Sequence, residues 1–217
     1  MLTGPLFLPE LADENGLVAV GGDLRPERLL QAYRSGVFPW FDETTPILWW
    51  SPDPRAIFEI GGLHVSRRLL RTIRSGRFAT TINRDFSSVI RGCADRPGDG
   101  NWITVEMIAA YETMHRLGHA HSIEVWRQGM LVGGIYGIAI NGFFAGESMF
   151  SRASDASKVA LACLMDRLEK RGSQLLDVQF LNEHTERLGA IEIPRSDYLE
   201  RLQNALRTPV TFFDPLE

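Results

Sequence analysis

The sequence predicts an α/β (α+β) protein in which a small N-terminal domain precedes a larger domain built on a mixed sheet. Prolines and glycines punctuate the chain closely before residue 55. Beyond that point, strand-like and helix-like apolar patterns alternate. The dipeptides Gln128-Gly129 and Asn141-Gly142 each join two apolar runs, as hairpin turns do. Part of the sheet is therefore expected to be antiparallel.

The N-terminal domain is expected to span residues 1–54 and to be rich in turns. One helix fits inside it, over residues 26–33, with Pro26 in its first turn and Gly36 after its end. Residues 51–54, Ser-Pro-Asp-Pro, predict a linker. The larger domain then covers residues 55–217.

The larger domain is expected to alternate strands and helices. Ser66 and Thr104 are candidate N-caps, and Gly118 and Gly172 are candidate helix ends. The predicted strands are residues 56–60, 78–82, 121–127, 130–140, 143–150, 175–180 and 191–193, and the predicted helices are residues 66–75, 85–93, 104–116, 154–170, 183–188 and 196–207.

Composition excludes several protein classes. Hydrophobic residues make up 44% of the 217 residues and charged residues 23%, which excludes a disordered chain. The sequence shows neither an apolar run long enough for a membrane helix nor a secretory signal. Two cysteines make neither a disulfide framework nor a zinc site. We therefore expect a cytoplasmic protein.

Positive charge is concentrated in one segment. The net charge is −4, but residues 63–96 hold eight arginines and two aspartates, a local charge of +6. A preference for arginine codons could explain 21 arginines against two lysines, but not their clustering. On the predicted 66–75 helix the expected buried side is Leu69, Leu70 and Ile73, while the exposed side carries Arg67, Arg71 and Arg74, flanked by Arg68 and Arg77. Such a side is either simply solvated or binds a polyanion.

Three polar residues interrupt apolar strands. Glu147 lies within the predicted 143–150 strand, where an unpaired buried carboxylate would be costly. Asp177 and Gln179 alternate with apolar neighbours, so on a regular strand they would stand about 7 Å apart on one face. They could hold one substrate group from two sides. The alternatives are an edge-strand Glu147 facing water and a solvated polar face for the other two.

Aromatic and histidine residues allow more than one interpretation. Tryptophans concentrate early, with Trp40 and Trp102 as candidate stacking surfaces for nucleobases or as ordinary core residues. His115, His119 and His121 follow no metal-ligand spacing, and His184 is a weak candidate for a proton shuttle. A nucleophile elbow, a P-loop and a GxGxxG turn are missing from the sequence.

A string of motifs resembles the leucyl/phenylalanyl-tRNA–protein transferase family. The matching blocks run through nearly the whole chain in order: Asn15-Gly-Leu-Val-Ala-Val-Gly-Gly-Asp23, Gly36-Val-Phe-Pro-Trp-Phe41, Ile47-Leu-Trp-Trp-Ser-Pro-Asp-Pro-Arg55, Trp102-Ile-Thr104, residues 117–126, Gly133-Gly-Ile-Tyr-Gly137, Gly146-Glu-Ser-Met-Phe-Ser-Arg152 and Asp177-Val-Gln-Phe-Leu-Asn182. The resemblance implies a C-terminal domain like the GCN-five-related acetyltransferases. Acetyltransferases hold coenzyme A phosphates on a Gly-rich turn, but residues 151–157 lack that pattern and carry Asp155, which disfavours coenzyme A.

The implied reaction moves Leu or Phe, and less well Met, from aminoacyl-tRNA to the N-terminal Arg or Lys of acceptor proteins, which marks them for N-degron proteolysis. An aminoacyl ester is already activated, so neither a metal nor another cofactor is expected; the protein is expected to be a monomer that does not bind membranes. By the resemblance, Asp177 and Gln179 contact the attacking amine and Glu147 lies by the aminoacyl group. The implied binding residues are Trp40 and Trp102 for the terminal adenosine, Ile135, Phe144 and Leu164 for the Leu or Phe side chain, and Arg67, Arg68, Arg71, Arg74 and Arg77 for the tRNA backbone.

Two other function classes stay open at this stage. One is an acyl-coenzyme A-dependent N-acyltransferase, against which the 151–157 turn counts. The other is a non-catalytic tRNA-binding module, against which the polar residues inside apolar strands count.

Overall fold

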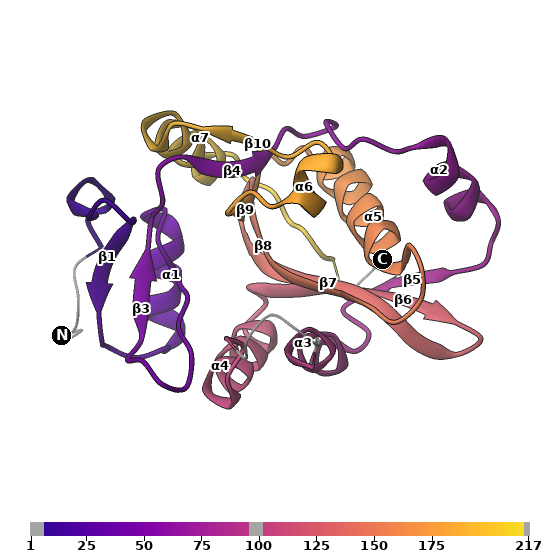
Figure 1. Cartoon of the computed structure of the whole chain (residues 1–217), viewed down its shortest axis with the longest axis horizontal. Coiled ribbons are helices and arrows are strands. Elements are labelled where there is room, and N and C mark those ends of the chain that lie inside the picture. Colours follow the sequence, from indigo (N-terminus) through magenta and orange to yellow (C-terminus); the bar gives the residue numbers. More distant parts are fainter. Residues whose placement is uncertain (1–6, 96–101, 215–217) are drawn as a thin grey trace.

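A computed structural model describes residues 7–95 and 102–214, so Arg96 of the basic segment lies outside the described residues. The N-terminal part forms a three-stranded antiparallel sheet in the order β1-β3-β2 (Figure 1). Its elements are the short 3-10 helix η1 (Pro9–Leu11), β1 (Leu17–Val20), α1 (Pro26–Arg34), β2 (Phe38–Pro39) and β3 (Leu48–Trp50).

The rest of the described chain is built on a seven-stranded sheet in the order β10-β4-β9-β8-β7-β6-β5. Its strands are β4 (Arg55–Phe58), β5 (Ala79–Ile82), β6 (Ala120–Arg127), β7 (Met130–Ile140), β8 (Phe143–Ser151), β9 (Leu175–Gln179) and β10 (Ile191–Ile193). Strands β8 and β9 pair in parallel, while β5, β6, β7 and β8 form an antiparallel series. The expected α/β class with a mixed sheet is confirmed.

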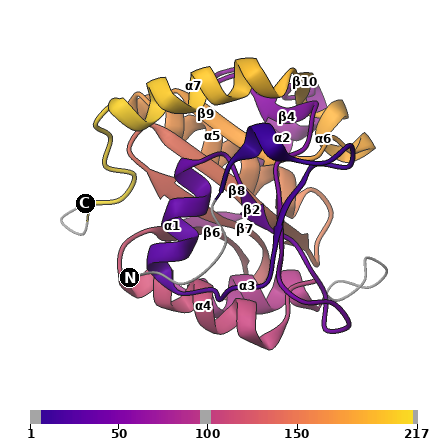
Figure 2. The same ribbon diagram turned by 90° about the vertical axis from the view of Figure 1, so that its left-hand side faces the viewer.

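Helices cover both faces of the large sheet, with α3 and α4 on one face and α5 on the other (Figure 1). The helices are α2 (Arg67–Arg74), α3 (Phe86–Ala94), α4 (Val105–Arg116), α5 (Ala156–Arg171), α6 (Glu183–Arg187) and α7 (Arg195–Arg207). Seen from the side of the N-terminal sheet, α1 runs between α7 and α4 and contacts both (Figure 2). No helix in the described ranges is long and apolar enough to cross a membrane.

The core has two halves, one on each face of the large sheet. One half joins Leu29, Tyr33 and Trp49 of the N-terminal part to Tyr111 and to Tyr198 of α7. The other half packs the apolar side of α5 against the sheet. Because the N-terminal part shares a core with the large sheet, the predicted 51–54 linker is packed against the protein at its first two residues, Ser51 and Pro52, which are buried.

Local sequence signals placed most elements within two residues of their observed ends. Ser66 Oγ accepts a hydrogen bond from the Leu69 amide and Thr104 Oγ1 from the Met107 amide, as expected of N-caps. Gln128 and Asn141 each adopt a φ of 53°, which their hairpin turns require. The prediction missed the three strands of the N-terminal sheet.

The parallel strands β8 and β9 pair only briefly and then separate. Their register joins Phe143 to Leu175, Phe144 to Leu176 and Ala145 to Asp177. Beyond Ala145, β8 continues to Ser151 while β9 ends at Gln179. The separation opens a gap in the middle of the sheet, and the candidate site lies there.

Helix α2 stands apart from the body of the protein (Figure 1). Of its expected buried side only Leu69 is buried, while Leu70 is 37% and Ile73 38% exposed, so the prediction of a three-residue buried side was wrong. The reason is a cavity of about 520 Å³ between α2, β5 and α5, whose lining includes Leu70 and Ile73 of α2, Thr80 of β5 and Val159 of α5. The five arginines at 67, 68, 71, 74 and 77 are exposed, as expected.

Candidate active site

The last residue of β9 turns the chain sharply. Gln179 has a φ of 59°, in the left-handed region, and the Phe180 amide donates to the Val178 carbonyl across it at 2.7 Å. This three-residue turn is a γ-turn of the rarer, more strained kind. It ends the alternation of the strand, so the expected common face for Asp177 and Gln179 does not form.

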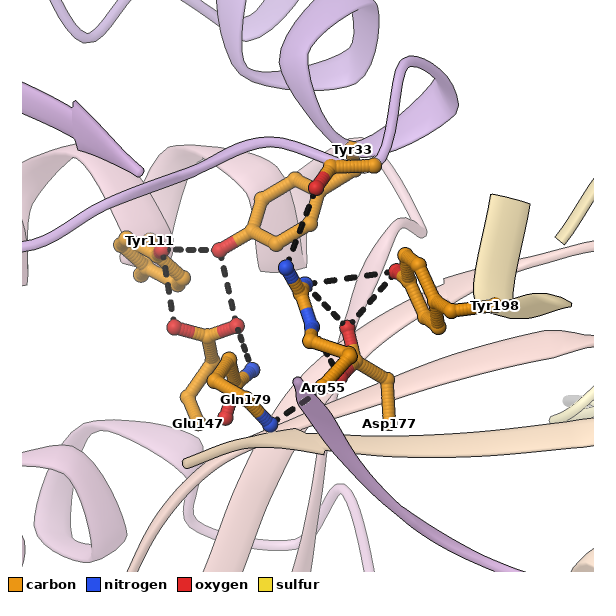
Figure 3. A network of polar contacts seen from close by, with 8 residues as sticks. Tyr33, Arg55, Tyr111, Glu147, Asp177, Gln179 and Tyr198 are labelled. Atoms are coloured by element: carbon orange, nitrogen blue, oxygen red, sulfur yellow. Dashed lines mark hydrogen bonds and ion pairs between the residues drawn. The ribbon is translucent and has the colours of Figure 1, made fainter. Parts of the chain in front are cut away.

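Asp177 is held by a buried arginine. Its Oδ1 accepts from Arg55 Nε at 2.8 Å and from the Gln179 amide at 3.0 Å, and its Oδ2 accepts from Arg55 Nη2 at 2.7 Å and from the Tyr198 hydroxyl at 2.9 Å (Figure 3). Arg55 is 1% exposed and Asp177 0%. Burial lowers the pKa of Arg55, but the Asp177 carboxylate beside it raises it more, so the guanidinium stays charged. The two charges neutralise each other inside the protein.

Glu147 of β8 lies in a second network, on the other side of the Gln179 side chain (Figure 3). Tyr33 donates to Glu147 Oε1 at 2.8 Å and Tyr111 donates to Oε2 at 3.2 Å. The two phenol oxygens are also hydrogen-bonded to each other. Gln179 Nε2 donates to Glu147 Oε1 at 3.4 Å. Residues from α1, α4, β8 and β9 therefore meet at one carboxyl group.

A count of protons shows what this second network prefers. Three contacts link the four oxygens of Tyr33, Tyr111 and Glu147, and each contact needs one proton. If both phenols donate to Glu147, no proton is left for the contact between them; a protonated Glu147 supplies the third proton by donating to one phenol, which is then free to donate to the other. Burial, opposed by the tyrosine hydroxyls, raises the pKa of Glu147 to about 7, which agrees with this count. Burial also raises the pKa of both phenols, so they stay protonated.

One cavity of about 200 Å³ lies against the N-terminal part and is walled by aromatic rings. Trp40 and Trp102 both line it, so the structure brings these two predicted residues together. Trp40 is 43% exposed and contacts the Phe180 ring at 5.5 Å between centroids. The remaining lining residues are Phe38, Pro39, Glu147, Val178, Gln179, Phe180 and Asn182.

A second cavity of about 160 Å³ lies between β8, β9 and α5. Of the three residues predicted for an apolar side-chain pocket, Ile135 lines it; Phe144 and Leu164 do not, although both are buried in the same half of the core. Leu161, Met149 and other residues that the sequence did not single out line it instead. Only the three-dimensional arrangement shows which apolar side chains of a helix or strand reach a cavity.

The two cavities meet at a common wall. Both are lined by Glu147 and Gln179, together with Trp102, Val178 and Asn182. Asp177 lines neither cavity, because its carboxylate faces Arg55 and Tyr198. Of the three predicted catalytic residues, Glu147 and Gln179 therefore reach the open space and Asp177 stands behind them.

The other candidate residues lie elsewhere. His121 is buried with its Nδ1 2.9 Å from Asn83 Nδ2, and burial lowers its pKa to about 4. His184 is exposed and lines neither cavity of the candidate site. Asp155 precedes α5 with a φ of 69° and lies 3.7 Å from Arg68 and 3.4 Å from Lys158. Within residues 7–95 and 102–214, no three His, Cys, Asp or Glu side chains gather as a metal site would require.

Sequence reasoning missed the residues that support the site. Tyr33, Arg55, Tyr111 and Tyr198 each contact one of the two carboxylates. These residues lie far from their partners along the chain: Tyr198 is 21 residues from Asp177, and Arg55 is 122 residues from it. The one available signal is Arg55 itself, a charged residue at the start of an apolar run.

Comparison with known proteins shows which family the chain belongs to. The family model described as "Leucyl/phenylalanyl-tRNA protein transferase" matches residues 57–203, and that of its N-terminal domain matches residues 22–53. The chain belongs to the leucyl/phenylalanyl-tRNA–protein transferase family. As a member of this transferase family it is an enzyme, and the resemblance seen in its motifs is confirmed.

Several relatives carry the name of that transferase family. The chain is 52% identical over 209 residues to one from Solidesulfovibrio magneticus, covering 94% of this chain and 85% of the relative. It is 50% identical over 215 residues to one from Escherichia coli O1:K1, and the match covers 95% of this chain and 92% of the relative. Both relatives are thus similar to this chain over nearly its whole length.

Among solved structures, the transferase chain is similar to acetyltransferases. One is a GCN5-related N-acetyltransferase from Kribbella flavida, with a TM-score of 0.41, 13% identity and coverage of 78% of this chain and 61% of that chain. Another is a ribosomal-protein-alanine N-acetyltransferase from Brucella melitensis, with a TM-score of 0.37, 19% identity and coverage of 51% and 86%.

Proposed function

We propose that this transferase takes leucine or phenylalanine, and less well methionine, from aminoacyl-tRNA and joins it to the N-terminal Arg or Lys of an acceptor protein. The observation that carries the proposal is that two cavities of different character meet at Glu147 and Gln179. The charged 3′ end of a tRNA has an adenosine and an amino acid on either side of one ester bond. That bond fits the junction of the two cavities.

The aromatic cavity suits the terminal adenosine. Trp40 and Trp102 line it, and an aromatic ring contributes about 1–3 kcal/mol by stacking on a base. Replacing either tryptophan with alanine is therefore expected to weaken the binding of a puromycin-like aminoacyl-adenosine analogue by roughly 5–150-fold. Trp126, which lines neither cavity, supplies the matched control.

The second cavity suits an apolar or aromatic amino acid side chain that is not branched at Cβ. Ile135, Leu161 and Met149 line it, and Phe144 and Leu164 are proposed to shape it from behind. One methylene group changes binding by only about 1–3 kcal/mol in an apolar pocket. Discrimination between leucine, phenylalanine and methionine is thus expected to be incomplete.

The chemistry joins an amine to an ester. The acceptor's α-amine, with an ordinary pKa of about 7.7–8.0, attacks the ester carbonyl carbon. The new C–N bond forms, the bond from that carbon to the ribose oxygen breaks, and the amine loses one proton. We assign to the ionised form of Glu147, present beside the neutral form near its pKa of about 7, the task of taking that proton, and the carboxyl group then returns it to the leaving ribose oxygen. Its position on both cavities and its pKa of about 7 support this role.

Gln179 is proposed to orient the attacking amine. Its Nε2 donates to Glu147, and its Oε1 can accept a hydrogen bond from the amine beside the same carboxyl group. Asp177 is proposed to act through Gln179 rather than by contact with substrate, because it accepts from the Gln179 amide and has no exposed surface. It is a positioning residue in this mechanism.

The remaining parts of the proposal concern the partners. The exposed arginines of α2 and Arg77 are assigned to tRNA phosphates, which give affinity without reading the base sequence. The protein is proposed to act as a cytoplasmic monomer that marks acceptors for N-degron proteolysis. A domain boundary near residue 54 is proposed from the same motifs.

One experiment tests the reaction and its two alternatives. The protein is incubated with labelled Leu-tRNA and a peptide that begins with Arg, and label in the peptide is measured. Matched peptides begin with Ala or carry an acetylated N-terminal Arg. The proposal expects label in the Arg peptide only. Retention of tRNA without transfer would indicate a binding module, and transfer from leucyl-coenzyme A instead would indicate an acyltransferase.

A further inference from the structure

Arg55 contacts both the carboxylate of Asp177 and the wall of the aromatic cavity. In addition to its two bonds to Asp177, its Nη1 donates to the carbonyl of Gly36, two residues beyond the end of α1, at 3.1 Å. Its guanidinium carbon lies 4.7 Å from the centre of the Phe38 ring and 4.4 Å from the centre of the Tyr198 ring. Phe38 belongs to the aromatic cavity, so one buried arginine contacts both that cavity's wall and the carboxylate behind Gln179.

The contacts close into a ring. From Arg55 they run to Asp177, whose Oδ1 also fixes the amide of Gln179 in the strained γ-turn. After this turn Phe180 packs against the N-terminal part, and the centre of its ring lies 5.7 Å from the centre of the Phe38 ring. Phe38 in turn lies against Arg55. The aromatic wall and the Gln179 turn are therefore connected through Arg55 and Asp177.

We infer that Arg55 is a positioning residue for the transfer reaction, holding the adenosine-binding wall and the Gln179 turn in register. The inference deepens the proposed function and rests on it. Arg55 lies between the two segments matched by the family models, residues 22–53 and 57–203, so it is placed to join them. A planar guanidinium is required, since its separate N–H groups donate to Asp177, Gly36 and Tyr198 at once.

The first test replaces Arg55 with lysine, which keeps the charge but loses the fork of donors. Turnover of Leu-tRNA with the Arg peptide is expected to fall about 10–100-fold at saturating substrates, since small misplacements of reacting groups have effects of this size. The dissociation constant of the aminoacyl-adenosine analogue is expected to rise, because Phe38 and Phe180 lose their support. Both quantities are measured well below the melting temperature of the variant.

Arg28 provides the matched control. It is also 1% exposed and also paired with an aspartate, Asp23, at 3.1 Å, but it lines neither cavity. Arg28→Lys is expected to lower the melting temperature while turnover and analogue affinity stay within twofold of the wild type. A purely structural Arg55 would behave in the same way.

If Arg55→Lys does not fold, the variant Tyr198→Phe tests the inference instead. It removes one hydroxyl that donates to Asp177 Oδ2 and leaves the ion pair in place. Turnover is expected to fall about three- to tenfold with a small change in melting temperature. The inference is overturned if the folded variant, Arg55→Lys or otherwise Tyr198→Phe, keeps wild-type turnover and analogue affinity. A wild type that binds the analogue but transfers no leucine would instead refute the proposed function.

Discussion

Asp177 and Asp155 are both aspartates paired with arginines, but the two pairs lie in opposite surroundings. The Arg55–Asp177 pair is 2.7 Å long and buried between β4 and β9, with side chains 1% and 0% exposed. The Arg68–Asp155 pair between α2 and α5 spans 3.7 Å, and Arg68 is 75% exposed. Chemistry at a single ester bond needs groups fixed to a fraction of an ångström, whereas phosphate binding tolerates a loosely held, solvated helix. The two regions therefore differ as the proposed transfer site and the proposed phosphate-binding helix require.

The largest effect is expected at the fixed region. Gln179→Ala removes the side chain that lies between Glu147 and the proposed amine position. Turnover is expected to fall about 10²–10⁴-fold, the usual range for acid–base and orienting groups, while the analogue still binds. The measurement is single-turnover transfer from labelled Leu-tRNA, and the control is Gln174→Ala, at the exposed residue just before β9. Wild-type turnover in a folded Gln179→Ala protein would remove this residue from the mechanism.

The two ion pairs are expected to differ in stability. Asp177→Asn leaves the buried Arg55 charge without its counter-charge, so the free energy of unfolding is expected to fall by about 3–5 kcal/mol. Asp155→Asn is expected to change the free energy of unfolding by less than about 1 kcal/mol, because its partner Arg68 is largely exposed. Asparagine also tolerates the positive φ of this position. Urea denaturation of both variants checks the difference. Equal losses would mean that burial does not distinguish the pairs.

The pH dependence of stability tests the Glu147 network. Its pKa is raised from 4.5 to about 7 in the folded protein, chiefly by burial, so the folded state favours the neutral carboxyl. This contribution to stability is present below pH 4.5 and is lost as pH rises through 7. The free energy of unfolding of the wild type, measured relative to the Glu147→Gln variant, whose side chain stays neutral, is expected to fall by up to about 3 kcal/mol between pH 5 and 8. A stability difference that does not change with pH would contradict the raised pKa.

The smallest effect is expected at the loosely held region. Changing Arg67, Arg71 and Arg74 together to alanine is expected to lower the slope of log affinity for tRNA against log salt by roughly 0.7–0.9 per lost phosphate contact. Stability is expected to change little, because the three side chains are exposed. The analogue, which lacks a tRNA backbone, should bind as before. An unchanged salt slope would show that tRNA docks elsewhere.

Signals that act within a few residues allowed most of the fold to be predicted. Caps such as Ser66 and hairpin turns such as Asn141-Gly142 are local, so the helices and long strands were found near their observed ends. The N-terminal strands are only two to four residues long and depend on pairing between residues far apart, such as Leu17 with Trp50, which no local pattern reveals.

The candidate site could be predicted only in part for the same reason. Alternation marked Asp177 and Gln179 as unusual, but the positive φ of Gln179 that breaks the alternation leaves no trace in the residue type. The periodicity of α2 identified an apolar side without showing that a cavity lies beneath Leu70 and Ile73. Burial of a charge such as Arg55 depends on a partner 122 residues away.

The long distance along the sequence between these partners affects how the enzyme folds during its synthesis. The groups that meet around Glu147 and Asp177 come from α1, β4, α4, β8, β9 and α7, nearly the whole length of the chain. During synthesis the ribosome releases Tyr33 and Arg55 long before Asp177 and Tyr198 exist. Contacts between such distant residues form late, since a long loop must close first. A nascent or truncated chain that lacks α7 also lacks Tyr198, so its transfer centre cannot assemble until that helix has been synthesised.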